Sequence, residues 1–191
     1  MYDVTPGLPD GAVVDEAAVA FAVRDSTVVG VLSRPVAPAT IGVIIVVGGP
    51  QYRVGSHRQF VALAWALAAA GVAVLRFDYR GMGDSGDRLR SFEQVDDDLR
   101  AAVDTLLREQ PQLEQLALWG LCDGASAALM YAPQDDRVTA LALANPWARG
   151  DDTQARTQLM HYYARRLFSR DLWRRALGGR LRLRQTVGDL S

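Results

Sequence analysis

The chain has 191 residues, of which 49% are hydrophobic and 23% charged, and its formal net charge is −1. This length and composition predict one domain with a buried core and a small appendage. The near-zero charge argues against nucleic-acid binding, which usually requires a basic excess. One cysteine excludes an intramolecular disulfide. No apolar run is long enough for stable membrane insertion and no signal-peptide pattern begins the chain, so we expect a cytoplasmic protein.

Strand-like and helical patterns alternate along most of the chain. An early pair of β-rich stretches predicts a hairpin, and two continuous apolar runs are typical of strands buried on both faces of a parallel sheet. We place the strands at residues 17–23, 27–33, 41–47, 72–77, 116–119 and 138–144, and the helices at 56–70, 92–108 and 123–131, with Ser56 as a cap of the first helix.

This alternation predicts an α/β fold, with a mostly parallel sheet, flanking helices and right-handed crossovers. The pattern changes after Asn145-Pro146, since residues 151–177 are rich in arginines and aromatics with helical spacing. We therefore divide the chain into a core at residues 1–150, which runs through the sixth strand, and a helical cap-like segment and tail at 151–191.

The only cysteine lies at a predicted corner of the backbone. In WGLCDGAS, residues 119–126, a short strand meets a helix at Gly120-Leu-Cys122-Asp-Gly124. Strand, Gly-x-nucleophile-x-Gly and helix are the layout of a nucleophile elbow, where the flanking glycines let strand and helix meet. A helix N-terminus also favours a thiolate, so we interpret Cys122 as a candidate nucleophile. The alternative is a small buried hydrophobe in a chance motif.

A second glycine-rich loop follows the strand at 72–77. In RFDYRGMGDSGD, residues 76–87, the spacing of the polar and glycine residues is typical of the corresponding turn in many α/β-hydrolases. We expect these residues to shape the loop and hydrogen-bond beneath the site without taking part in chemistry. They are Asp78, Arg80, Gly81, Gly83 and Ser85.

Four segments in this order, VVGGPQYRVGSHRQF, LRFDYRGMGDS, WGLCDGASA and NPWAR, closely resemble the α/β-hydrolases encoded with exosortase A systems, of the type called hydrolase 1. The resemblance runs from the first hairpin to the cap-like helices. It implies an α/β-hydrolase fold and a presumed hydrolase from bacterial loci for exopolysaccharide production and C-terminal protein sorting. It implies no particular substrate.

Site roles follow from this resemblance. Cys122 would be the nucleophile, and the backbone N–H of Asp123 would be one donor of the oxyanion hole. The usual second donor falls on Pro50, which has no N–H, so Gly49 or Gln51 would replace it. The side chain of Asp123 is expected to make a structural bond. No metal or organic cofactor is implied.

A general base is harder to assign. The two candidates are His57, which precedes the elbow, and His161, which lies in the cap-like helices. Histidines in such places are usually surface or packing residues. Compared with the family, we expect the chain to be truncated before the last two strands, which normally supply the acid and base. Residues 138–144 would then form an open sheet edge, from which we expect either self-association or marginal stability.

Two functions follow from these observations. The first is a cysteine-dependent hydrolase or acyltransferase that acts on a small-molecule ester or thioester. The second is a catalytically incomplete hydrolase-like scaffold that binds a partner. Nucleotide binding is excluded, because the glycine order is wrong and the chain has no lysine for a phosphate loop.

Overall fold

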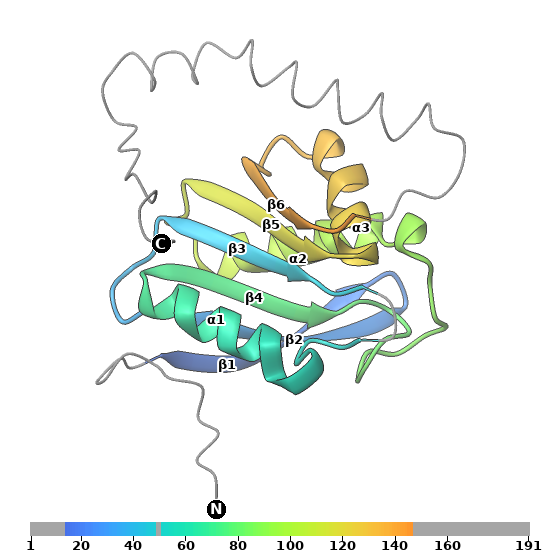
Figure 1. The fold of residues 1–191 in the computed structure, drawn as a ribbon, viewed down its shortest axis with the longest axis horizontal. Coiled ribbons are helices and arrows are strands. Elements are labelled where there is room, and N and C mark those ends of the chain that lie inside the picture. The colour runs from blue at the N-terminus through green and yellow to red at the C-terminus, as the bar shows by residue number, and fades with distance from the viewer. Residues whose placement is uncertain (1–13, 49–50, 147–191) are drawn as a thin grey trace, which may run out of the picture. The chain divides into compact units, whose positions relative to one another are not determined.

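A computed structural model describes residues 14–48 and 51–146 (Figure 1). Six strands form one mixed sheet in the order β1-β2-β4-β3-β5-β6. Strand β2 runs antiparallel to both of its neighbours, β1 and β4, and β4, β3, β5 and β6 run parallel to one another. The strands are β1 (Asp15–Val23), β2 (Ser26–Arg34), β3 (Ile41–Val46), β4 (Val72–Asp78), β5 (Gln115–Leu121) and β6 (Ala140–Ala144).

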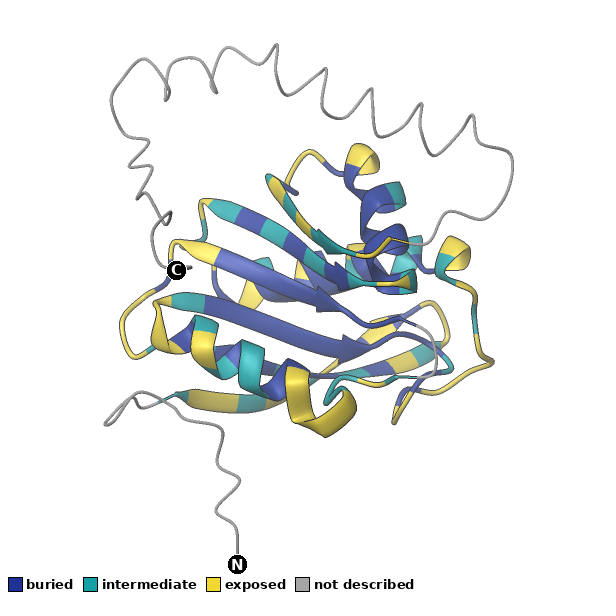
Figure 2. Cartoon of the chain, viewed as in Figure 1, coloured by how far each residue is buried: buried dark blue, intermediate teal, exposed yellow. Residues whose placement is uncertain are grey.

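The continuous apolar runs form the centre of the sheet. Nearly every residue of β3 and β4 is buried, as Figure 2 shows, in keeping with their place at the centre of the sheet. β1 instead alternates between exposed and more buried residues, and β6 is only partly covered. The core is centred on three adjacent parallel strands, where Ile44, Leu75 and Leu118 are at most 1% exposed.

Three helices connect the parallel strands: α1 (Gln59–Ala69), α2 (Asp96–Glu109) and α3 (Asp123–Tyr131). The chain moves from β3 outward to β4, and then crosses back over β3 to β5. Right-handed crossovers in opposite directions place α1 on one face and α2 and α3 on the other, as Figure 1 shows. Such a reversal opens a crevice at the carboxyl ends of the strands, where α/β proteins bind ligands.

The predicted α/β fold with a mostly parallel sheet is confirmed, and the differences are local. Ser56 does not cap α1: a 3₁₀ turn (Ser56–Arg58) precedes the helix, and neither segment has a side-chain cap. The last strand begins at Ala140 instead of Val138, because the Thr139 hydroxyl accepts a hydrogen bond from the Leu116 N–H and so interrupts the regular ladder.

Short 3₁₀ turns (Phe92–Gln94 and Ala132–Gln134) precede α2 and follow α3. Among the residues that the structure describes, no helix is both long and apolar enough to cross a bilayer. The predicted cap-like segment and tail, 151–191, lie outside the described residues.

Candidate active site

The backbone turns sharply between β5 and α3, and Cys122 occupies the turn. Its φ of 52° and ψ of −120° lie outside the regions that L-residues normally adopt. Such a conformation costs about 1–3 kcal/mol and persists only where the surroundings hold it. The Cys122 N–H donates to the Ala144 carbonyl at 3.0 Å, and the Cys122 carbonyl accepts from the Ala125 N–H at 3.0 Å and the Ser126 N–H at 3.1 Å.

Glycines allow the segments around this turn to touch. A Cβ on Gly120 would lie 2.5 Å from the Gly124 carbonyl oxygen and 2.6 Å from the Ala125 backbone nitrogen. A Cβ on Gly124 would overlap the Val46 carbonyl of β3, and one on Gly48 would overlap the Gly124 nitrogen. Strand β5, helix α3 and the end of β3 therefore meet backbone to backbone, and side chains at these three positions would separate them.

The turn presents the Cys122 thiol on the surface. The residue is exposed, and it directly precedes the first residue of α3. The first N–H groups of a helix have no acceptor within it and carry a partial positive charge. The arrangement therefore places an exposed sulfur directly beside the N-terminus of α3.

Asn145 is the one side chain that hydrogen-bonds the thiol among the described residues: its Nδ2 lies 3.7 Å from the Cys122 Sγ. It follows β6 directly and has a left-handed φ of 49°. The sequence analysis did not select it. The available signal was its position, since it is the only asparagine of the chain and stands immediately after a parallel strand.

The loop after β3 is tied to the end of β4. The Arg53 N–H donates to the Asp78 carboxylate at 2.6 Å, and the Arg53 guanidinium bridges Asp78 and Asp84. Gln51 is half-buried, and its side-chain carbonyl accepts from Gln59 of α1 at 3.2 Å. The other candidate for the second oxyanion donor, Gly49, lies outside the described residues, as does Pro50.

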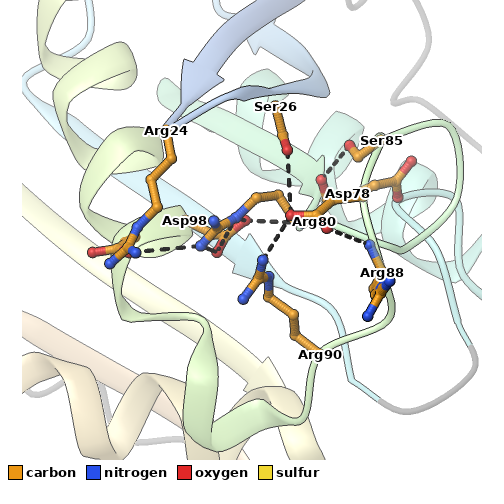
Figure 3. Close-up of polar contacts among 10 residues, drawn as sticks. Arg24, Ser26, Asp78, Arg80, Ser85, Arg88, Arg90 and Asp98 are labelled. Carbon is orange, nitrogen blue, oxygen red and sulfur yellow. Dashed lines mark hydrogen bonds and ion pairs between the residues drawn. The ribbon is translucent and has the colours of Figure 1, made fainter.

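The loop after β4 wraps around Asp78 (Figure 3). The Ser85 hydroxyl donates to the Asp78 carbonyl at 2.5 Å and accepts from the Val29 N–H at 2.9 Å, which ties the loop to β2. Gly83 has a φ of 50°, and a Cβ there would overlap the Asp78 carboxylate. A Cβ on Gly81 would overlap the Arg88 carbonyl. The backbone of this loop therefore packs closely against the Asp78 carboxylate and against itself, which fits the structural role predicted for the loop.

Arg80 anchors the same loop to α2. Its Nη2 lies 2.8 Å from Asp98 Oδ2, its Nε is 3.1 Å from both carboxylate oxygens, and the Arg80 N–H donates to Oδ1 at 2.9 Å. Both side chains are buried, and Figure 3 shows them facing each other. Removing either partner of a buried pair that makes all these bonds lowers the stability of the fold far more than removing one partner of an exposed pair.

Tyr79 connects this loop with the corner at Cys122. Burial raises the pKa of Tyr79 to about 12, and the negative charges of Asp123 and Asp98 act in the same direction. The phenol therefore stays neutral at physiological pH. The charge of Asp123 interacts with this buried phenol. Asp123 is therefore linked electrostatically to a core residue and also follows Cys122 directly in sequence.

The histidines do not join this cluster in the described part of the chain. His57 is exposed, has a left-handed φ of 50°, and lies in the turn before α1. His161 lies outside the described residues. No group of three or more His, Cys, Asp or Glu side chains within residues 14–48 and 51–146 is placed to hold a metal ion.

The mixed sheet, the crossover helices and the strand–turn–helix corner define an α/β-hydrolase fold. The sequence profile described as serine aminopeptidase, S33, matches residues 40–183, and the chain belongs to this hydrolase family. The comparison with curated proteins finds no match.

Solved structures show the same fold. An α/β-hydrolase, GrgF from Penicillium sp. sh18, is 26% identical with a TM-score of 0.62, over 86% of this chain and 56% of that one. The Pyrococcus furiosus esterase Pf2001 is 22% identical with a TM-score of 0.65, over 80% and 57%. XC6422 from Xanthomonas campestris, an α/β serine hydrolase without a lid, is 26% identical with a TM-score of 0.59, over 73% and 66%. The chain thus spans little more than half the length of the first two.

Proposed function

We propose that this member of the hydrolase family is an esterase or thioesterase that uses Cys122 as its nucleophile and forms a covalent acyl-enzyme. The observation that carries the proposal is the exposed sulfur at a strained corner, directly before a helix N-terminus. Backbone strain of this kind is concentrated at functional sites. The substrate class is a small-molecule ester or thioester, in keeping with the esterase among the similar structures.

The chemistry has two steps. The Cys122 sulfur attacks the acyl carbon, a C–S bond forms, and the carbonyl oxygen becomes an oxyanion. The backbone N–H of Asp123 and a second N–H, from Gly49 or Gln51, bind this oxyanion. The carbonyl then re-forms as the bond to the alkoxide or thiolate breaks, and the leaving group takes the proton that the Cys122 thiol gave up. Water hydrolyses the thioester in the second step, or an alcohol accepts the acyl group.

An ester assay tests the role of the thiol. The full chain should hydrolyse p-nitrophenyl acetate faster than the background rate, and Cys122→Ala should lose that excess. Cys122→Ser is the matched variant, because it keeps the shape of the turn and offers the weaker nucleophile that is common in this family. Equal rates for the wild type and Cys122→Ala would overturn the proposal.

The second candidate is a binding scaffold without catalytic activity. It is favoured by one observation: within the described residues the single histidine, His57, is exposed and makes no hydrogen bond to a carboxylate. A thiol without a base still reacts with alkylating reagents but turns over esters slowly. Stoichiometric acylation of Cys122 with no turnover would identify this case.

The resemblance of the sequence to hydrolase 1 proteins supports a narrower setting, in which the protein serves an exosortase A and exopolysaccharide system in the cytoplasm. The genes beside its own test this directly. An exosortase gene and polysaccharide-synthesis genes in the same cluster are expected, and their absence would contradict the assignment.

Self-association through β6 is a further part of the proposal. In the part of the chain that the structure describes, β6 pairs only with β5, and Ala140 and Ala142 on it are exposed. Unpaired strand edges bind other strands, and a lysine on the edge blocks this. Sedimentation should show a concentration-dependent dimer that Ala142→Lys weakens and Ala66→Lys, on the exposed side of α1, does not. A monomer at every concentration would contradict it.

A further inference from the structure

We propose that Asn145 is a positioning residue that donates its side-chain amide N–H to the Cys122 sulfur and stabilises the thiolate before attack. This inference rests on the proposed function of Cys122 and adds a residue to it. The observation behind it is the 3.7 Å separation of Asn145 Nδ2 and Cys122 Sγ. Sulfur is a large, weak acceptor when neutral, and a donor at this distance gains strength once the sulfur carries a charge.

Strand pairing brings these two residues together. Leu121 and Ala144, the last residues of β5 and β6, are partners in the parallel ladder. The residues that follow them are therefore neighbours at the same edge of the sheet, although 23 positions separate them in sequence. The Cys122 N–H donates to the Ala144 carbonyl at 3.0 Å, so backbone hydrogen bonding joins the same two turns.

Both residues of the contact have a positive φ. Cys122 and Asn145 both have a left-handed φ, 52° and 49°. Asparagine tolerates this region better than most residues with a Cβ. The left-handed turn gives β6 an abrupt end, and the amide reaches the thiol from that turn. The strained residue, Cys122, is thus in direct contact with Asn145, and a strained conformation persists only where its neighbours hold it.

The neutral amide complements the local charge. Asp123 follows Cys122 directly, and a carboxylate beside a thiolate opposes its ionisation. Tyr79, a titratable group on which the charge of Asp123 acts, stays neutral at this pH. The N–H groups at the start of α3 and the amide of Asn145 oppose the effect of Asp123. An amide takes up no proton at neutral pH, so Asn145 stabilises the charge on sulfur and leaves the base to another group.

Alkylation of the single cysteine by iodoacetamide, followed against pH, tests this role without any substrate. Two variants keep the left-handed turn accessible: Asn145→Gly removes the amide, and Asn145→Asp replaces it with a negative charge of the same shape. We expect Asn145→Gly to react about 3- to 10-fold more slowly at pH 7, Asn145→Asp more slowly still, and both midpoints to move to higher pH.

The high-pH limit separates this role from a structural one. Once the thiol is fully ionised, the three proteins should react at similar rates, whereas a collapsed or blocked turn lowers the rate at every pH. Thermal melts by circular dichroism confirm that each variant is folded. A profile for Asn145→Gly that superimposes on the wild type, or that lies above it at pH 7, would overturn the inference. Ester hydrolysis by Cys122→Ala tests the proposed function separately, so either idea can fail alone.

Discussion

The close approach of β5 and α3 predicts that Gly120→Ala destabilises the protein. The new Cβ would lie 2.5–2.6 Å from three backbone atoms of Gly124 and Ala125, whereas ordinary contact begins at 3.4 Å. A backbone neighbour cannot rotate away, so the strand and the helix must move apart. Overpacking of this kind costs about 1–3 kcal/mol. The reduced freedom of the unfolded chain offsets about 0.4–1 kcal/mol of this.

Urea denaturation followed by tryptophan fluorescence measures the change, because Trp119 is the residue before Gly120. We expect a net loss of roughly 1–2 kcal/mol, which lowers the melting temperature by roughly 2–8 °C. Gly86→Ala is the matched control, since nothing lies within 4 Å of a Cβ there and its φ is not left-handed. It should be neutral or slightly stabilising. A stability of Gly120→Ala equal to that of Gly86→Ala would refute the close approach.

Three further predictions concern the polar contacts around the site. Asp98→Ala leaves Arg80 buried without its partner and should lower the free energy of unfolding, measured in urea, by about 3–5 kcal/mol. Arg24→Ala, which breaks an exposed pair with Asp97, should lower it by less than about 1 kcal/mol. Similar losses for the two variants would contradict the account of the buried pair. Ser85→Ala removes a hydroxyl that bonds the Asp78 carbonyl and the Val29 N–H, and should cost about 1–3 kcal/mol in the same assay; a neutral result would show that water replaces it. Hydrogen bonds from Arg137 lower the pKa of Asp135 to about 2, although burial opposes this. The ionised carboxylate therefore contributes stability above about pH 4, and this contribution is lost as the pH falls toward 2. Asp135→Asn should make the stability depend less on pH in that window, and an unchanged pH dependence of acid unfolding would contradict this.

The centre of the fold could be predicted from the sequence because its signals are local. The apolar runs at 41–47 and 72–77 needed burial on both faces, and only a covered parallel sheet supplies it. The start of α1 could not be predicted this way. Ser56 has the chemistry of a cap, but His57 and Arg58 adopt left-handed φ values and separate it from the helix. No propensity rule anticipates two consecutive residues of this kind.

In the candidate site, too, local features could be predicted from the sequence and long-range contacts could not. The Gly-x-Cys-x-Gly spacing placed Cys122 between a strand and a helix, because the motif itself encodes the close approach of the two elements. Asn145 and Arg53 left no comparable signal. Their contacts, with Cys122 and Asp78, span 23 and 25 positions and arise from the order of strands in the sheet. Contacts that arise only from sheet topology can be predicted once the order of the strands is known.

The central claim, that the Cys122 sulfur attacks an acyl carbon, is tested most directly by trapping its product. The full chain is mixed with p-nitrophenyl acetate, quenched with acid within seconds, digested and examined by mass spectrometry. We expect one acetyl group on the peptide that contains Cys122, formed at the rate of p-nitrophenol release and absent from Cys122→Ala. Hydrolysis without acetylation of that peptide, or acetylation only elsewhere, would contradict the account.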